Sequence, residues 1–490
     1  MADQPIHPNP SSTIPTGKNI VICCDGTGNE FGSSNSNVVR LYTALDLSDD
    51  TKQVGYYHPG VGTMGAPTAR NVIDKEWTRI AGLAFAGGFR DNVFDAYRYL
   101  MEIYNEGDRV FFFGFSRGAY TVRALSGLLH GYGLLSRGNE GHLPYAWNSF
   151  TKQVKQKGDD EAKGTLMHHT VDADFSFRET FSHSNFSIHF VGLWDTVSSV
   201  GWIYTPLRLL YTATNPLLRT ARHAISIDEH RCFFRDNLYG KPGPGQDIVQ
   251  VWFPGVHSDV GGSYSSETSG LSNTAFQWIL GEAQTADLLT VPDRVNLVLG
   301  LPTVNHYSAE PFYEAPPNPG HEIHRSLSGA WLLAELLPQR YYDKLRNIEL
   351  FRVPLGNRRF IPAGSIIHPS AWDLLNRKYP AEPIYQPSNL LKAHLQPGAA
   401  VPFDTTADLT SFYTYNPPAT ITQGPPTLQR RLRVIFIGIP AFAIFVLLVA
   451  IIAFLLLSVA CWLAIHLCHW TGLFWSCLLG HMDKFATKCG

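Results

Sequence analysis

Short runs of β-branched and aromatic residues alternate with helical periodicity between residues 18 and about 286. Helices are predicted in the stretch that ends near residue 107, in the stretch after residue 116, and in LSNTAFQWILGEAQ (271–284). Strands that alternate with helices favour βαβ units, so we expect an α/β fold with a mostly parallel sheet and flanking helices. The runs that predict strands are NIVICC (19–24), VGYY (54–57), RVFFFGF (109–115), FSIHFVGLW (186–194) and IVQVWFPGV (248–256).

Changes in composition divide the rest of the chain. Proline-rich segments mark joints, and residues 290–415 are richer in proline and less periodic than the α/β part. The predicted organisation is a disordered arm (1–17), a catalytic α/β domain (18–289), a cap or accessory region that completes it (290–415), a Pro-rich linker with a basic flank (416–433), a transmembrane helix (434–465) and a short C-terminal tail (466–490).

The transmembrane prediction comes from a charge-free stretch. No Asp, Glu, Lys or Arg occurs from Val434 to Gly480, and residues 434–465 are apolar or small apart from Pro440 and Ser458. A membrane span needs about 20 such residues. Three arginines precede the stretch, so the positive-inside rule predicts one span with the large N-terminal part in the cytosol. Two alternatives remain for the tail: an interfacial segment around 470–475, or a helical hairpin with both ends cytosolic.

Overall composition narrows the class of protein. Lys+Arg number 39 and Asp+Glu 41 among 490 residues, so the formal net charge of -2 argues against a generally basic nucleic-acid binder. The seven cysteines show no zinc spacing and are too sparse for a disulfide framework, which favours a reducing compartment. The first twenty residues contain no apolar run of the kind that a secretory signal peptide needs.

A candidate nucleophile lies between a predicted strand and a predicted helix. The string G-F-S-R-G, from Gly114 to Gly118, follows the apolar run RVFFF and precedes a helical pattern. A nucleophile elbow needs a strand, a strained turn and a helix, with small residues on both sides of the nucleophile. The order of these features therefore indicates Ser116 as a nucleophile, with the helix dipole directed at it.

A serine needs a base and an orienting acid, which in hydrolases on such sheets follow it in the order acid, then histidine. Asp195 follows the predicted strand 186–194, and His257 follows the predicted strand 248–256 in a glycine-rich loop. We expect these two to complete a triad. The rival histidines are His168 and His169 in a polar stretch, and His223 and His230 in an apparently helical pattern.

Asp259 is the rival acid because it lies two residues after His257. It could also pair with His257 as an H-x-D metal ligand, but no third or fourth ligand is evident, so no metal site is predicted. We expect Asp259 to support the histidine loop instead.

The first predicted strand ends in CCDGTGNEFG, a loop whose glycines present backbone N–H groups. Such groups, with the N–H after the nucleophile, can form an oxyanion hole, so the predicted donors are Gly26, Thr27 and Arg117. Asp25 is expected to organise this loop. A nucleotide-phosphate site is the alternative, although the full G-x-G-x-x-G pattern and a P-loop lysine are missing.

Five strings together resemble a known family: CDGTGN, the segment from Asn92 to Leu125, VGLWDTVSSVG, RHAISIDEHR and VWFPGVHSDVGGSY. They resemble the catalytic domain of bacterial type VI secretion phospholipase effectors and its fungal relatives, over about residues 18–285 and again at 367–390. The resemblance implies an α/β-hydrolase fold, a triad of Ser116, Asp195 and His257, and phospholipase A-type ester hydrolysis. The opening motif lacks the tryptophan that the family more often has before the asparagine, and the predicted anchor is unlike a secreted effector.

The expected function is a membrane-anchored serine hydrolase that acts on lipid or other carboxylic esters without a cofactor. Its partners would be an ester substrate and a membrane, with no nucleic acid. Two other functions stay open: a catalytically silent scaffold tethered to a membrane, and an esterase of a small-molecule pathway.

The predicted topology has a direct test. Protease added to sealed microsomes should digest the N-terminal domain, because the arginines before residue 434 hold it on the cytosolic side. Protection of that domain would mean that the topology is inverted. A chain truncated after Pro426 should leave the membrane pellet on carbonate extraction, and its retention would show that another segment is the anchor.

Overall fold

The protein is described by a computed structural model in which one sheet-based unit holds most of the described chain. Of the second unit, the structure describes only residues between Leu332 and Leu355. The residues described are 17–26, 34–60, 86–151, 176–197, 201–202, 205–206, 209, 211–265, 268–304, 322–336, 339–343, 348–375 and 385–390.

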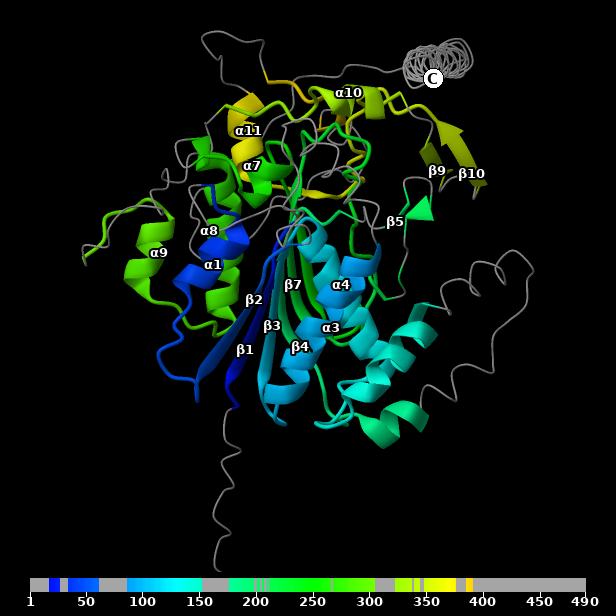
Figure 1. Ribbon diagram of the computed structural model, residues 1–490. Helices are drawn as coiled ribbons and strands as arrows, with labels where there is room; N and C mark the ends of the chain where they lie inside the picture. Colours follow the sequence, from blue (N-terminus) through cyan, green and yellow to red (C-terminus); the bar gives the residue numbers. More distant parts are fainter. Residues whose placement is uncertain are drawn as a thin grey trace, which may run out of the picture. The chain divides into compact units, whose positions relative to one another are not determined.

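Seven strands form the central sheet of the first unit, and every neighbouring pair is parallel (Figure 1). The expected α/β fold with a mostly parallel sheet is therefore confirmed. In spatial order the strands are β11 (Ile366–Ile367), β8 (Asp247–Phe253), β7 (Leu218–Ser226), β4 (Ile188–Trp194), β3 (Arg109–Phe115), β1 (Asn19–Cys24) and β2 (Gln53–His58).

Helices cover both faces of this sheet. On one face lie α3 and α4, and on the other lie α1 and α8 (Figure 1). Helices among the described residues include α1 (Asn37–Ala44), α3 (Ala86–Ile103), α4 (Arg117–Tyr132), η1 (Glu140–His142), α7 (His257–Gly261), α8 (Gly270–Thr285), α9 (Pro292–Val298), α10 (Ala330–Ala334) and α11 (Pro369–Leu375).

Side chains of β1 alternate between two hydrophobic cores. Ile20, Ile22 and Cys24 pack in the core that contains α3 and α4, whereas Val21 and Cys23 pack in the core that contains α1 and α8. A parallel strand buried on both faces needs apolar residues at every position, which explains the unbroken run NIVICC. Burial raises the pKa of both cysteine thiols, to about 12 for Cys24, so both are held protonated.

The expected strands are all present, but two strands of the central sheet, β7 and β11, were not predicted, and one histidine was misplaced. β7 lies between β4 and β8 and contains His223, so the prediction of a helical pattern around His223 is wrong. Its sequence LRTARHAIS contains two arginines and a histidine, which interrupt the hydrophobic pattern expected of a central strand. Arg222 pairs with Glu282 and Asp247 at 2.5 and 2.6 Å, so tertiary partners make its burial possible.

Part of the predicted accessory region is built into the sheet. β11 pairs with β8 at its outer edge, and Ile361 and Leu390 pack with Ile225 and Trp252 in a third hydrophobic cluster. Two short antiparallel pairs complete the description: β5 (Gly201–Trp202) with β6 (Thr205–Pro206), and, in the second unit, β9 (Gln339–Asp343) with β10 (Ile348–Arg352).

Within the described ranges, no helix combines the length and apolarity that crossing a bilayer would require. The predicted transmembrane segment 434–465, the linker 416–433 and the tail 466–490 lie outside the described residues, as does the predicted arm 1–17 except for its last residue.

Two glycines offer a matched test of this packing. A Cβ on Gly192 in β4 would lie 2.6 Å from the Phe113 ring and 2.8 Å from the Ile279 side chain. Gly192→Ala should therefore lower the free energy of unfolding by about 1–3 kcal/mol, because the core has no room for it. Gly131→Ala in α4 meets no atom within 4 Å and should raise that free energy by about 0.4–1 kcal/mol. Denaturant unfolding of both variants measures the difference, and equal effects would contradict the packing argument.

Candidate active site

Ser116 lies at the turn between β3 and α4. Its backbone has φ 59° and ψ -121°, a strained combination for a residue with a side chain. A Cβ on Gly118 would lie 2.1 Å from the carbonyl oxygen of Cys24, and one on Gly114 would lie 2.6 Å from Cα of Ala119. The two glycines therefore allow α4 to start directly against the ends of β3 and β1. The predicted strand, strained turn and helix are all present.

Asp195 is the first residue after β4. Phe115 pairs with Trp194 in the sheet, so Ser116 and Asp195 leave neighbouring strands at the same level. Asp195 has φ 40°, its N–H donates to the Ala224 carbonyl at 2.8 Å, and its side chain is completely buried. The parallel register thus brings a serine and a carboxylate to one edge, where the ligand sites of open α/β sheets gather.

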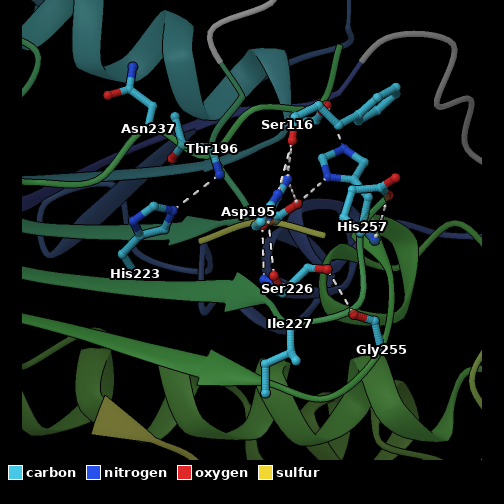
Figure 2. Close-up of polar contacts among 12 residues, drawn as sticks. Ser116, Asp195, Thr196, His223, Ser226, Ile227, Asn237, Gly255 and His257 are labelled. Carbon is cyan, nitrogen blue, oxygen red and sulfur yellow. Dashed lines mark hydrogen bonds and ion pairs between the residues drawn. The ribbon is translucent and has the colours of Figure 1, made fainter. Parts of the chain in front are cut away.

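His257 begins α7 in the loop after β8, and its ring lies between Ser116 and Asp195 (Figure 2). Nε2 accepts a hydrogen bond from Ser116 Oγ at 2.7 Å, and Nδ1 donates to Asp195 Oδ2 at 2.5 Å. This arrangement assigns the proton of the neutral ring to Nδ1. Phe115 stacks on the ring and Phe234 meets it edge-on, with centroids 4.7 and 4.8 Å away, so the imidazole is held in place.

The charges at this site favour a carboxylate beside a neutral imidazole. Burial alone would raise the pKa of Asp195, but the Arg359 guanidinium and the His257 hydrogen bond outweigh burial and hold that pKa well below its usual range. Burial lowers the pKa of His257, and the hydrogen bond to Asp195 opposes this effect. A neutral imidazole that accepts from a serine hydroxyl is the state that a general base requires.

Asp259 turns away from this chain of contacts. Its carboxylate accepts the Val256 N–H at 2.9 Å, the His324 N–H at 3.1 Å and the His324 Nδ1–H at 2.6 Å. The ring of His324 stacks on Tyr264. The contacts of Asp259 therefore hold the backbone in front of His257, as expected of a loop-supporting residue. Among the described residues, no group of three or more His, Cys, Asp or Glu side chains is arranged around a metal position.

Asp25 organises the loop after β1. Its carboxylate accepts the Gly26 N–H at 2.6 Å, the Ser36 hydroxyl at 2.6 Å and the Tyr57 hydroxyl at 2.8 Å. The Gly26 N–H is therefore engaged with Asp25 and would have to exchange this bond to serve an oxyanion. Thr27, the second predicted donor of this loop, lies outside the described residues, and Arg117 is the first residue of α4.

Among the described contacts, none joins a rival histidine to the Ser116 hydroxyl. His223 accepts the Thr196 N–H at Nε2, 3.1 Å away (Figure 2). Its Nδ1 faces Gln250 Oε1 at 3.4 Å. Burial lowers the pKa of His223 to about 3, so it is a neutral acceptor that fixes the turn after Asp195. His230 bonds to the Gly356 carbonyl, and His168 and His169 lie outside the described residues.

Sequence reasoning missed the charged residues around the triad positions. Glu229 accepts the His257 N–H at 3.2 Å and pairs with Arg231 through both carboxylate oxygens, at 3.0 and 2.8 Å. Asp228 accepts the Gly255 N–H at 2.8 Å and pairs with Arg358. The string RHAISIDEHR had marked this segment without giving its residues a role, whereas no pattern marked Arg358 or Arg359.

The fold and these contacts define an α/β protein with a buried, hydrogen-bonded Ser-His-Asp chain at the carboxyl ends of its parallel strands. The chain belongs to the family described as the T6SS phospholipase effector Tle1-like catalytic domain, whose family model matches residues 18–282, just over half of the sequence. The resemblance predicted from the sequence motifs is thereby confirmed.

Two individual proteins are similar to this chain. A Saccharomyces cerevisiae protein named Uncharacterized protein YEL023C is 34% identical over 233 residues, which span 46% of this chain and 33% of the yeast protein. The match therefore covers only a third of that relative. The crystal structure of an uncharacterized protein from Pseudomonas aeruginosa is similar at 19% identity and a TM-score of 0.35, over 61% of this chain and 49% of the other.

The two candidate acids can be separated by substitution. Asp195→Asn should lower kcat for a short soluble ester by about 10⁴, because the amide no longer favours the required imidazole tautomer. Asp259→Asn should lower kcat at least about tenfold less, because the Asp259 carboxylate contacts the loop backbone and His324 rather than the imidazole of His257. Steady-state kinetics and melting curves of both variants decide the point. A more damaging Asp259→Asn, with both variants melting like wild type, would reverse the assignment.

Proposed function

We propose that this protein is a membrane-anchored serine hydrolase that cleaves carboxylic esters of lipids. The observation that supports it most is the pair of contacts at His257, which accepts from Ser116 Oγ at 2.7 Å and donates to Asp195 Oδ2 at 2.5 Å. A serine hydroxyl is a weak nucleophile unless an oriented base takes its proton, and this geometry supplies the base and the orienting acid together.

In this proposal Ser116 Oγ attacks the acyl carbonyl carbon while His257 Nε2 takes the hydroxyl proton. His257 then gives that proton to the leaving alcohol, and the same base activates the water that releases the acyl group. Asp195 holds the imidazole tautomer and stabilises the imidazolium. The Arg117 N–H, at the start of α4, and the N–H groups of Gly26 and Thr27 are the proposed oxyanion donors. No step requires a cofactor.

The lipid substrate rests on two further supports. The family description names phospholipase effectors, and the charge-free segment 434–465 would hold the site close to bilayer lipids. The arginines before that segment favour a cytosol-facing catalytic domain. Local concentration near the membrane would favour lipid esters over soluble ones.

Ser116→Ala should lower kcat by roughly 10⁴–10⁶ and abolish labelling by a fluorophosphonate probe, because the covalent route passes through Ser116 Oγ. Ser126→Ala is the matched control: this buried α4 serine donates only to the Val122 carbonyl of its own helix, and the variant should retain activity. The substrates are a short soluble ester and vesicles of mixed phospholipids, with lysophospholipid and fatty acid as products.

Each other outcome identifies a different function. Hydrolysis by Ser116→Ala within tenfold of wild type would remove Ser116 as the nucleophile. Wild-type protein that is neither labelled nor active would support the silent scaffold. Cleavage of the soluble ester without phospholipid products would support a small-molecule esterase.

A further inference from the structure

The carboxylate of Asp195 has a second charged neighbour besides His257. Arg359 Nη1 donates to Asp195 Oδ1 at 2.5 Å, and Nη2 donates to Oδ2 at 3.0 Å. The Ser226 N–H donates to Oδ1 at 2.9 Å. Both side chains of this ion pair are buried: 5% of the Arg359 side chain and none of the Asp195 side chain is exposed. The planar guanidinium of Arg359 thus binds both carboxylate oxygens of Asp195, the residue that accepts from the His257 imidazole.

Arg359 is itself fixed by backbone carbonyls. Its Nε and Nη2 donate to the Phe234 carbonyl at 3.0 and 2.5 Å, and Nη1 lies 3.3 Å from the Ser226 carbonyl. Two residues further on, Ile361 is buried in the hydrophobic cluster with Ile225. These contacts leave the guanidinium little freedom to turn away from the carboxylate.

The matched family domain ends at residue 282, so Arg359 comes from outside it. We propose that Arg359 is a positioning residue for the hydrolysis assigned above: it keeps Asp195 ionised and oriented, and it offsets the negative charge that Asp195 presents to His257. The expected effect of Arg359 on turnover rests on the proposed function, whereas its effect on the charge and orientation of Asp195 does not.

A completely buried carboxylate without a cation tends to take up a proton. With Arg359 present, the pKa of Asp195 stays well below its usual range although burial alone would raise it. The same positive charge reduces the net negative field at the imidazole. A smaller negative field leaves His257 neutral, and so able to act as a base, down to lower pH.

Among the described residues, the other charged and titratable groups close to this site include Glu229, Arg231, Asp236 and His223, with Arg123 acting on His223. Glu229 and Arg231 form an ion pair and largely cancel one another at His257. Asp236 contributes a negative charge near Arg359. His223 is neutral, because burial lowers its pKa to about 3. Arg359 is therefore the cation that directly balances Asp195 among the described residues.

Removal of the Arg359 charge should act on both titrating groups in the same direction. The pKa of Asp195 rises because burial is no longer opposed by the guanidinium, and the pKa of His257 rises because the carboxylate is no longer balanced. Activity needs Asp195 ionised and His257 neutral. Either change raises the pH at which that state becomes populated, so the acidic limb of kcat/KM should move to higher pH.

The test compares Arg359→Met, Arg359→Lys and Arg358→Met in the full-length protein. Arg358 is the matched control, since it is the adjacent residue but pairs with Asp228. Arg359→Met should lower kcat/KM for a short soluble ester at least about 30-fold at pH 7 and move the acidic limb up by about one unit. Arg359→Lys keeps the charge without the planar guanidinium and should restore most of the limb position but less of kcat. Arg358→Met should leave the limb in place even if it lowers Tm.

An acidic limb that is unchanged in Arg359→Met, with a Tm loss like that of Arg358→Met, would reduce Arg359 to a structural role and overturn the proposal. A second measurement does not need turnover: the pKa of His257, followed by NMR of labelled histidine in a Ser116→Ala background. It should be higher in Arg359→Met than with Arg359 present, and Arg359→Gln, which also removes the charge, serves if the methionine variant does not fold. An equal pKa overturns the proposal. If the wild-type protein shows no Ser116-dependent hydrolysis, the proposed function is overturned instead. The NMR comparison still decides whether Arg359 controls the pKa of His257.

Discussion

A carboxylate with no exposed surface is the constraint on which the rest of the site depends. Asp195 would lose its charge in this environment unless every oxygen lone pair met a donor. The donors come from separate parts of the chain: the Ser226 N–H at the end of β7, His257 after β8, and Arg359. Satisfying one buried group therefore fixes the positions of two loops and a distant segment relative to β4.

The segment from residue 356 onward is tied to these loops by further buried contacts. Tyr385 donates to Asp228 at 2.8 Å, and Asn389 donates to the Ile227 carbonyl at 2.9 Å. A hydrophobic cluster that includes Trp252 and Ile361 supports the same junction. Buried polar contacts of this kind are costly when only partly satisfied, so the loops and the later segment stabilise one another.

Sequence patterns predicted five of the seven strands of the sheet and the three residues of the Ser-His-Asp chain, because each of these depends on local features. A strand buried on both faces is unbroken in its hydrophobicity, and loops after neighbouring parallel strands meet at one edge. β7 was missed because Arg222 and His223 are accommodated by partners that no local pattern reveals. Arg359 was missed for a related reason, since its contact with Asp195 joins residues 164 positions apart. Of the predicted oxyanion donors, the structure describes Gly26 and Arg117, whereas Thr27 lies outside the described residues.

The return of the chain at residue 356 also bears on how such a protein can diversify. The first unit is left after Trp331 and re-entered at Gly356, and Arg359 follows within three residues. Closing a longer loop costs little, about 0.6 kcal/mol for each doubling of its length. The residues between these two points can therefore lengthen or change over evolution without disturbing the grip on Asp195. By contrast, a domain cut at residue 282, where the family match ends, and moved into another protein would lack Arg359.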